Sequence, residues 1–389
     1  MNTIYAFTTL LTIFAIGNAV AEKTKAVLST VFICVVLLLL GFWSGLPADI
    51  ISYSFLQQLG IPMAGILVIG VGSNMDLRVL GKQWRTVIIA VVGALFGVAS
   101  IMLIGQLILG RYMAFVAGPI FAGTQVATIM LSEAVTNNNM PYLVPFILLI
   151  FVSDNLLGIP VTSLILKKEA RLFLQDKNQV KKYATITAEQ SSKKKRLIKI
   201  PDVLKSPSGV FARISLGASL SFWLASLTKG HVHFLVVCLF VGVILGELGF
   251  LEREAMKNSK AESFIMLVVT VFIFGGLADT SPSMLLGLLI PLMITLGAGF
   301  LGVLVSSFFL AKALKVSPWM GMAMAASCSY GMPATILIPK EVSEAVGQTE
   351  EEKTALKNYM VPNMVTAGFS SVTFASVFIA QIAVSLIFG

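Results

Sequence analysis

The stretch GMAMAASCSYGMPATILI, from Gly321 to Ile338, lies between long apolar runs but carries small and polar residues where a lipid-facing helix would carry Leu and Ile. Gly331 frees the backbone, and Pro333 removes an amide donor and restricts Met332. Irregular backbone at membrane depth is tolerated only where it is buried in protein or lines a wet cavity. The stretch therefore predicts a re-entrant hairpin whose tip meets a polar solute. A packing face of small residues between two helices is the alternative interpretation.

The composition indicates a polytopic membrane protein of the all-α class. Of the 389 residues, 57% are hydrophobic and only 12% are charged, and the mean hydropathy is +0.90. Soluble globular chains carry about 25% charged residues. The three cysteines lie in apolar context without CxxC spacing, so neither a disulfide framework nor a zinc site is indicated. We expect the chain in the plasma membrane, surrounded by lipid.

Ten apolar segments are candidates for membrane-spanning helices, since about 20 apolar residues cross a bilayer. The N-terminal segment could pass for a signal peptide, but it lacks a positive n-region and is interpreted as the first helix. The expected spans are residues 3–20, 26–45, 61–75 (after an interfacial piece at 51–58), 86–109, 140–166, 210–227, 232–250, 263–277, 284–313 and 360–388.

Basic residues orient these spans. Residues 167–208 hold twelve Lys and Arg against four Asp and Glu, which is +8 of the chain's net +9. The positive-inside rule places such a loop in the cytoplasm, and the loop does not indicate nucleic-acid binding. The remaining basic loops fall on the same cytoplasmic side if the opening stretch and the similar stretch at 114–130 are both re-entrant. Both termini are then outside.

The two halves of the chain match in order, which predicts an inverted repeat. Residues 1–166 would form the first repeat, 167–208 a cytoplasmic loop and 209–389 the second repeat, each with five spans and one re-entrant hairpin. Inverted repeats with interrupted segments at corresponding positions are the best sequence pointer to a secondary transporter. The matched residues are Thr24, Lys25 and Cys34 with Thr228, Lys229 and Cys238; Gly72 and Asp76 with Gly275 and Asp279; Gly118 and Ala122 with Gly321 and Ala325; Ala127, Thr128 and Ile129 with Ala334, Thr335 and Ile336; and Val144, Pro145 and Ser153 with Val361, Pro362 and Ser370.

Two facing hairpin tips predict a substrate site at the middle of the membrane. The first hairpin reads GPIFAGTQVATIMLSEA, from Gly118 to Ala134. Helix N-termini favour negative charge, so a small organic anion fits. The alternative is that small polar residues only let helices approach closely. The candidate substrate residues are Gly123, Thr124, Gln125 and Thr128 in the first hairpin and Ser329, Tyr330, Gly331 and Thr335 in the second.

Asp154 and Asn155 lie inside an expected span, where a carboxylate is costly and is a functional candidate by default. Carboxylate and amide oxygens can bind Na⁺, and an Asp can also carry a proton. In the second repeat, Asn363 and Ser370 supply neutral oxygens for a second, weaker cation site. The alternative for Asp154 is a structural role, in which it accepts hydrogen bonds from the amides of a broken helix.

The remaining polar residues favour structural roles. Asp76 and Asp279 follow glycine pairs at span ends and are expected to cap helices or to be solvated. The pair His231 and His233 is expected to be interfacial and not to bind metal. The chain has no phosphate loop, no GxSxG, no HExxH and no paired intramembrane carboxylates, so an enzyme is not indicated.

Several stretches resemble the bacterial sodium/glutamate symporters, within the wider superfamily of inverted-repeat anion carriers. They are NLLGIPVTSLILKK (155–168), HFLVVCLFVGVILGELG (233–249), AASCSYGMPATILI (325–338) and KNYMVPNMVTAGF (357–369). The resemblance implies an elevator-type carrier in which part of each repeat forms a dimeric scaffold and the rest carries glutamate or another carboxylate. The chain differs from the family's pattern at Asp154 and Asn155, where small glycine-type residues are expected. It also differs at Ser370 and Ser371, where an acidic residue is expected.

We therefore expect a secondary active transporter that couples Na⁺ or H⁺ to a small organic anion. No cofactor other than the coupling ion is expected, and the homodimer is implied by the resemblance alone. Two alternatives remain. The first is a cation/proton antiporter with Asp154 and Asn155 as its exchange site. The second is a non-transporting membrane subunit that docks a soluble partner on the basic loop.

Overall fold

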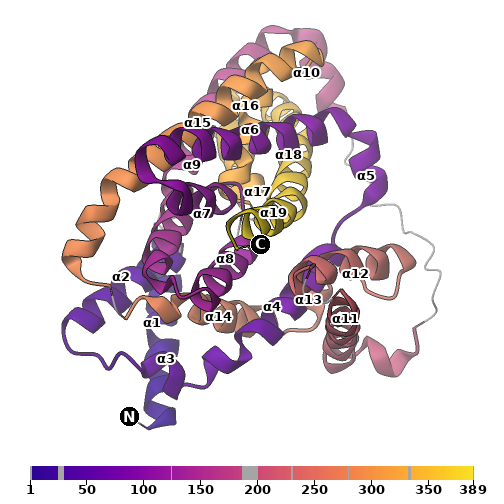
Figure 1. Ribbon diagram of the computed structural model, residues 1–389. Coiled ribbons are helices and arrows are strands. Elements are labelled where there is room, and N and C mark those ends of the chain that lie inside the picture. The colour runs from indigo at the N-terminus through magenta and orange to yellow at the C-terminus, as the bar shows by residue number, and fades with distance from the viewer. Residues whose placement is uncertain are drawn as a thin grey trace.

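The computed structural model describes residues 2–24, 30–123, 125–185, 200–228, 231–278, 280–331 and 334–388. These residues form helices and no strand (Figure 1). The helices of the first half are α1 (Thr3–Lys23), α2 (Thr30–Trp43), α3 (Ile50–Tyr53), α4 (Leu56–Ser73), α5 (Leu77–Lys82), α6 (Trp84–Leu109), α7 (Arg111–Phe121), α8 (Gln125–Asn137), η1 (Pro141–Leu143), α9 (Val144–Gln175) and α10 (Lys177–Ala184).

The helices of the second half follow in a similar order. They are η2 (Asp202–Lys205), α11 (Pro207–Leu227), α12 (Phe234–Leu248), α13 (Ala255–Asn258), α14 (Glu262–Ile273), η3 (Phe274–Gly276), α15 (Pro282–Ala313), α16 (Pro318–Ala326), η4 (Ser327–Ser329), α17 (Ala334–Val346), α18 (Glu350–Gly368), η5 (Phe369–Ala375) and α19 (Ser376–Phe388). Helix starts follow the local sequence. Ser206 and Ser281 cap α11 and α15 just before a proline, and Thr349 forms a capping box with Glu352 on α18.

Seven of the ten expected spans are apolar helices long enough to cross a membrane. The other three, Thr30–Trp43, Phe234–Leu248 and Glu262–Gly276, are apolar helices of 10–17 residues. At 1.5 Å per residue such a helix reaches at most about 26 Å, which is shorter than a hydrocarbon core of about 30 Å. The polytopic membrane architecture is therefore confirmed, whereas the count of ten and the inverted repeat stay predictions.

The helices pack into two groups (Figure 1). We call α1–α4 with α11–α14 the frame group; it fills the lower part of the view. We call α6–α9 with α15–α19 the site group; most of it fills the upper part, with α6 packed along α15 and α10 packed on α18. The segment 167–184 that sequence analysis assigned to a loop is largely helical, since it completes α9 and forms α10.

Glycines hold the frame group together where α4 crosses α12. A Cβ added to Gly242 would lie 2.6 Å from the carbonyl oxygen of Ile69, and one added to Gly246 would lie 2.7 Å from that of Ser73. Gly72 makes the reciprocal approach to α12. Backbones this close leave no room for any side chain, so the crossing is a tight contact of the kind small residues allow in membranes.

A corner of the same structure occurs in both halves of the frame group. After α3, the Ser54 hydroxyl donates to the carbonyl three residues before it (2.6 Å) and accepts from the amide two residues after it (3.3 Å). After α13, Ser259 makes the same two bonds at 2.6 and 3.2 Å. The next residues, Phe55 and Lys260, both have positive φ, 59° and 56°. Two unrelated side chains thus occupy one backbone geometry.

Asp76 lies at one of the span ends. Its carboxylate accepts from the Arg78 amide (3.0 Å) at the start of α5 and pairs with Arg253. Burial raises the pKa of Asp76, but the hydrogen bond and charge of Arg253 outweigh it and hold the pKa below its ordinary value. The capping role expected for Asp76 is confirmed, and Asp279 lies outside the described residues.

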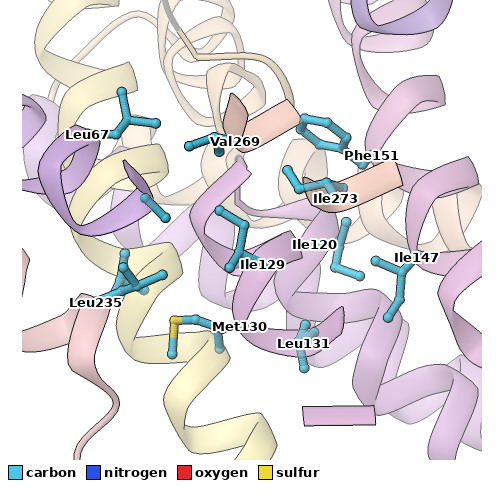
Figure 2. Close-up of a cluster of buried hydrophobic side chains, with 14 of the residues drawn as sticks. Leu67, Ile120, Ile129, Met130, Leu131, Ile147, Phe151, Leu235, Val269 and Ile273 are labelled. Carbon is cyan, nitrogen blue, oxygen red and sulfur yellow. The ribbon is translucent and has the colours of Figure 1, made fainter. Parts of the chain in front are cut away.

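The two groups meet across apolar side chains (Figure 2). Leu67, Val269 and Ile273 come from the frame group. Ile129 on α8, and Ile147 and Phe151 on α9, come from the site group. Apolar side chains make this contact, and they can exchange neighbours more readily than the close backbone approach between α4 and α12.

The crossing of α4 and α12 gives a stability prediction. Gly242→Ala should lower the free energy of unfolding by about 1–3 kcal/mol, because the new methyl group meets backbone atoms that cannot move aside. Thermal unfolding in detergent would measure it. The matched control is Gly287→Ala on α15, where nothing lies within 4 Å and the methyl group should be neutral or stabilising. Equal effects at both positions would contradict the close crossing.

Candidate functional site

The candidate site centres on Asp154, in the middle of α9. Its side chain is 1% exposed, and neither carboxylate oxygen has a hydrogen-bond partner among the described residues. A buried carboxylate normally has a partner, because loss of its hydration is costly. The structural role in which Asp154 would accept from helix amides is therefore not seen. An orphaned carboxylate instead needs a cation or a proton to neutralise it.

Asp154 shares one face of α9 with Gly158 and Thr162, since residues four apart lie one above the other. Gly158 lets the broken segment after α16 approach: a Cβ at this position would lie 2.2 Å from the Ser329 hydroxyl oxygen and 2.9 Å from Cδ1 of Tyr330. The Tyr330 hydroxyl lies beside that of Thr162, outside normal hydrogen-bond geometry. Asp154 and Thr162 on α9, and Tyr330 directly after η4, are thus buried polar side chains with unused hydrogen-bonding capacity.

The backbone is irregular next to Asp154, as the sequence predicts. Helix α16 ends at Ala326, and η4 follows with Ser327, Cys328 and Ser329 fully or almost fully buried. Gly331 then takes a φ of 62°, a conformation that glycine adopts easily. Met332 and Pro333 lie outside the described residues, and α17 begins at Ala334.

A second wall comes from α17 and the last long helix. The Thr335 hydroxyl is buried and has no partner among the described side chains and backbone, and a Cβ at Gly368 would lie 2.6 Å from its methyl carbon. Directly after Gly368 the chain forms the π-helix η5, which contains Ser370 and Ser371 and packs against η4. Single π-helical turns occur mainly at functional sites. The Ser370 hydroxyl donates to the carbonyl of Thr366 (2.9 Å), so its donor is used within the helix.

The first broken segment lies between α7 and α8. Gly123 packs against α19, because a Cβ there would lie 3.0 Å from that of Ser376. Thr124 lies outside the described residues, and Thr128 is fully buried on α8. Gln125 points to the frame group, where its amide donates to the Thr270 hydroxyl on α14 (3.2 Å).

The structure thus brings together only part of the predicted set. Asp154, Ser329 and Tyr330 lie around Gly158, and Gly331 and Thr335 continue the same wall. Asn155 is half-buried beside Asp154 on the next face of the helix. Asn363 lies elsewhere: its side chain accepts from the Thr86 hydroxyl (3.1 Å) near the basic end of the site group.

Gly158, Thr162 and the π-helix η5 belong to this site but were not among the residues predicted from the sequence. The spacing of Asp154, Gly158 and Thr162 by four residues was the available signal for the first two. The π-helix has no sequence signature, since Ser and Thr occur in ordinary helices as well.

Among the described residues, Asp154 is the one buried charged side chain at this site. The other buried charged side chains in the described ranges, Glu169 and Arg213, lie elsewhere and have partners: Glu169 accepts from Ser317 and Tyr359, and Arg213 donates to the Phe250 carbonyl. Among the described residues, no three His, Cys, Asp or Glu side chains lie close enough together to hold a metal ion. The oxygen-rich surroundings of Asp154 suit a proton or an alkali cation.

The histidine pair joins the two helix groups. His233 caps α12 by accepting the Leu235 amide at Nδ1 (3.2 Å), which leaves Nε2 as the protonated nitrogen, 3.4 Å from Glu133 on α8. Its backbone amide donates to Gln381 on α19 (2.8 Å), and Gln381 donates to the His231 carbonyl (3.2 Å). Both histidines therefore lie where the two helix groups meet.

A scan against protein-family models finds no match for this chain, and a search of curated proteins finds none either. We therefore infer function from the residues and their arrangement.

The contact at Gly158 gives a prediction for the site. Gly158→Val should displace Ser329 and Tyr330 from α9 and expose Cys328, which is fully buried in the native chain. Alkylation of Cys328 by a small maleimide, followed peptide by peptide by mass spectrometry, should become at least tenfold faster. Gly297→Val is the matched control, because nothing lies within 4 Å of Gly297. An unchanged alkylation rate in Gly158→Val would show that η4 does not depend on this glycine.

Proposed function

We propose that the protein is a secondary active transporter that couples Na⁺ or H⁺ to the movement of a small organic anion. The single observation that carries this proposal is the Asp154 carboxylate, buried in a membrane helix with no hydrogen-bond partner for either oxygen in the described part of the chain. Ionisable residues inside a membrane segment mark ion pathways by default. An ion or proton that binds Asp154 would remove the cost of burying its charge.

The broken helices beside Asp154 supply the substrate side of the proposal. Helices α8 and α17 both begin directly after a break and both contain 13 residues. Their N-terminal amides favour a carboxylate or another anion. Gly123, Thr124 and Thr128 would bind it from one side and Ser329, Tyr330, Gly331 and Thr335 from the other, with Asn155 and Ser370 as further oxygen donors for the cation. Gln125 and Asn363, which bond to Thr270 and Thr86, take no part in this site.

Repeated local structure supports the finer fold, ten spans in two inverted repeats of five with a re-entrant hairpin each. The corner at Ser54 recurs at Ser259, and the ends of α2 and α12 each bond to the segment that follows the other half's third span. In the first case Trp43 donates to the Thr280 carbonyl (2.8 Å), and in the second Glu247 accepts from the Leu77 amide (3.4 Å). Two halves related by a pseudo-two-fold axis in the membrane plane would make such a pair of matching contacts.

The two helix groups fit an elevator mechanism. The frame group, tied by glycines, would stay fixed, possess the dimer contact and resemble the scaffold of the sodium/glutamate symporter family. The site group would move as a body along the apolar interface in Figure 2. In this proposal the basic end faces the cytoplasm, both termini lie outside, and the chain sits in the plasma membrane.

One observation favours a second candidate, a cation/proton antiporter without an organic substrate. No buried Lys or Arg in the described residues lies near Asp154 to neutralise a substrate carboxylate. In that case Asp154 and Asn155 would be the exchange site. Flux would then depend on opposing ion gradients and would tolerate Thr335→Val.

Ligand-dependent stability tests the two candidates. Purified protein should gain thermal stability with one carboxylate only when Na⁺ or low pH is also present, because a ligand that binds the native state stabilises it by mass action. A panel of dicarboxylates, amino acids and sugar acids in Na⁺ and in choline, at two pH values, would measure this. Stabilisation by ion or pH alone would favour the antiporter.

Asp154→Asn should abolish this ion-dependent stabilisation and the ion-driven uptake in liposomes, because the amide carries no negative charge. Asp49→Asn is the matched control, since Asp49 is exposed and caps nothing with its side chain. Unchanged ion dependence in a folded Asp154→Asn protein would remove Asp154 from the mechanism.

The elevator proposal predicts the effect of joining the groups. A bismaleimide that links cysteines at Glu133 and His233 should stop uptake, because these residues lie on different groups. The matched control is a link between cysteines at Glu344 and Lys357, an ion pair inside the site group, which should leave uptake unchanged. Native cysteines are buried and should not react. Full uptake by the first linked protein would contradict the mechanism.

A further inference from the structure

A cavity of about 760 Å³ opens at the basic end of the site group, away from Asp154. The start of α6, the end of α9, α10, the start of α16 and α18 line it. Glu169 in its wall lies 15 residues beyond Asp154 on α9, which is about 22 Å along a helix axis. Its size is in the range of small-molecule sites, about 300–1,000 Å³. It is therefore separate from the proposed ion site.

The charge in this cavity is positive. Lys82, Arg85 and Lys315 line it, and none of the three forms an ion pair with a described carboxylate. The one acidic residue in the lining, Glu169, is 3% exposed and accepts hydrogen bonds from Ser317 and from the Tyr359 hydroxyl (2.8 Å). Glu169 is thus already satisfied, whereas the three basic side chains have no described carboxylate as a partner. Arg85 lies over the Trp84 ring, 5.4 Å from its centroid, which leaves its guanidinium edge for an anion.

Two helix N-termini add to this field. Helices α6 and α16 both begin at the cavity, and neither receives a hydrogen bond from its N-cap side chain, Gln83 or Ser317. Ser317 donates to Glu169 instead. Uncapped first-turn amides and the helix dipole favour an anion, and oxyanions bind such termini together with Lys and Arg.

We propose that this cavity binds a phosphate-bearing anion. The ligand chemistry has two possible sources, a soluble phosphate compound or the headgroup of an anionic phospholipid, because Trp84 and the basic side chains of α5 and α6 lie at the rim of an apolar helix bundle. Either ligand would bridge the starts of α6 and α16 and so link these two helices of the site group. The inference does not depend on transport.

The experiment uses the purified full chain and the double variant Arg85→Gln/Lys315→Gln. Inorganic pyrophosphate is titrated by calorimetry in detergent, and thermal stability is compared between nanodiscs of phosphatidylglycerol and of phosphatidylcholine. The matched control is Arg78→Gln/Lys312→Gln, which removes two basic residues of the same loops that do not line the cavity. Size-exclusion profiles verify that both variants are folded.

A soluble ligand predicts that pyrophosphate binds the native chain and the control alike, and at least tenfold more weakly to the double variant. A lipid ligand predicts that phosphatidylglycerol stabilises the native chain and the control, and that the double variant loses this stabilisation. Either result supports the cavity as an anion site and identifies its source. The proposal is overturned if the double variant and the control behave alike with both probes. It is also overturned if neither probe affects the native chain.

Discussion

The structure depends on one costly feature, the Asp154 carboxylate, which is buried inside a membrane helix and has no hydrogen-bond partner among the residues that the structure describes. The effective cost of burying an ion is several kcal/mol, which is a large part of a typical folding stability of about 5–15 kcal/mol. A chain that keeps Asp154 must therefore neutralise it. The irregular backbone around it follows from the same need. Gly158, η4 and the π-helix bring oxygen atoms to a depth where a regular helix would present only apolar side chains.

Packing inside a helix group differs from packing between the two groups. In the frame group, α4 and α12 touch backbone to backbone through Gly72, Gly242 and Gly246, a contact that has one arrangement. Between the groups, packing is made mainly by apolar side chains, with polar links at Gln125 and His233. Within the site group, a Cβ at Gly302 on α15 would likewise lie 2.7 Å from the Phe96 carbonyl oxygen on α6. Close backbone contacts thus lie inside each group, while the boundary carries side-chain contacts that can be exchanged at low cost.

Sequence analysis reached the class of fold, because apolar runs broken by Gly and Pro have few other interpretations. It also located both helix breaks and Asp154, since each is a local feature that membrane burial makes costly. It could not place side chains across helices. Gln125 and Asn363 were expected at the site, but the rotation of α8 and α18 turns them to Thr270 and Thr86. That rotation is set by packing in the whole bundle. Three helices are shorter than the sequence predicts, because a hydropathy window extends past the residue at which a helix ends.

The reciprocal ties between the halves have a consequence for synthesis. Trp43 donates a hydrogen bond to Thr280, and Leu77 donates one to Glu247, while α6 packs on α15. The first half therefore leaves the ribosome with its main partners not yet made. Until α15 and α16 are inserted, the polar face of α9 is without its neighbours η4 and α17. The nascent chain must remain in the bilayer as loosely associated helices, so that tertiary folding is a late event that follows insertion of nearly the whole chain.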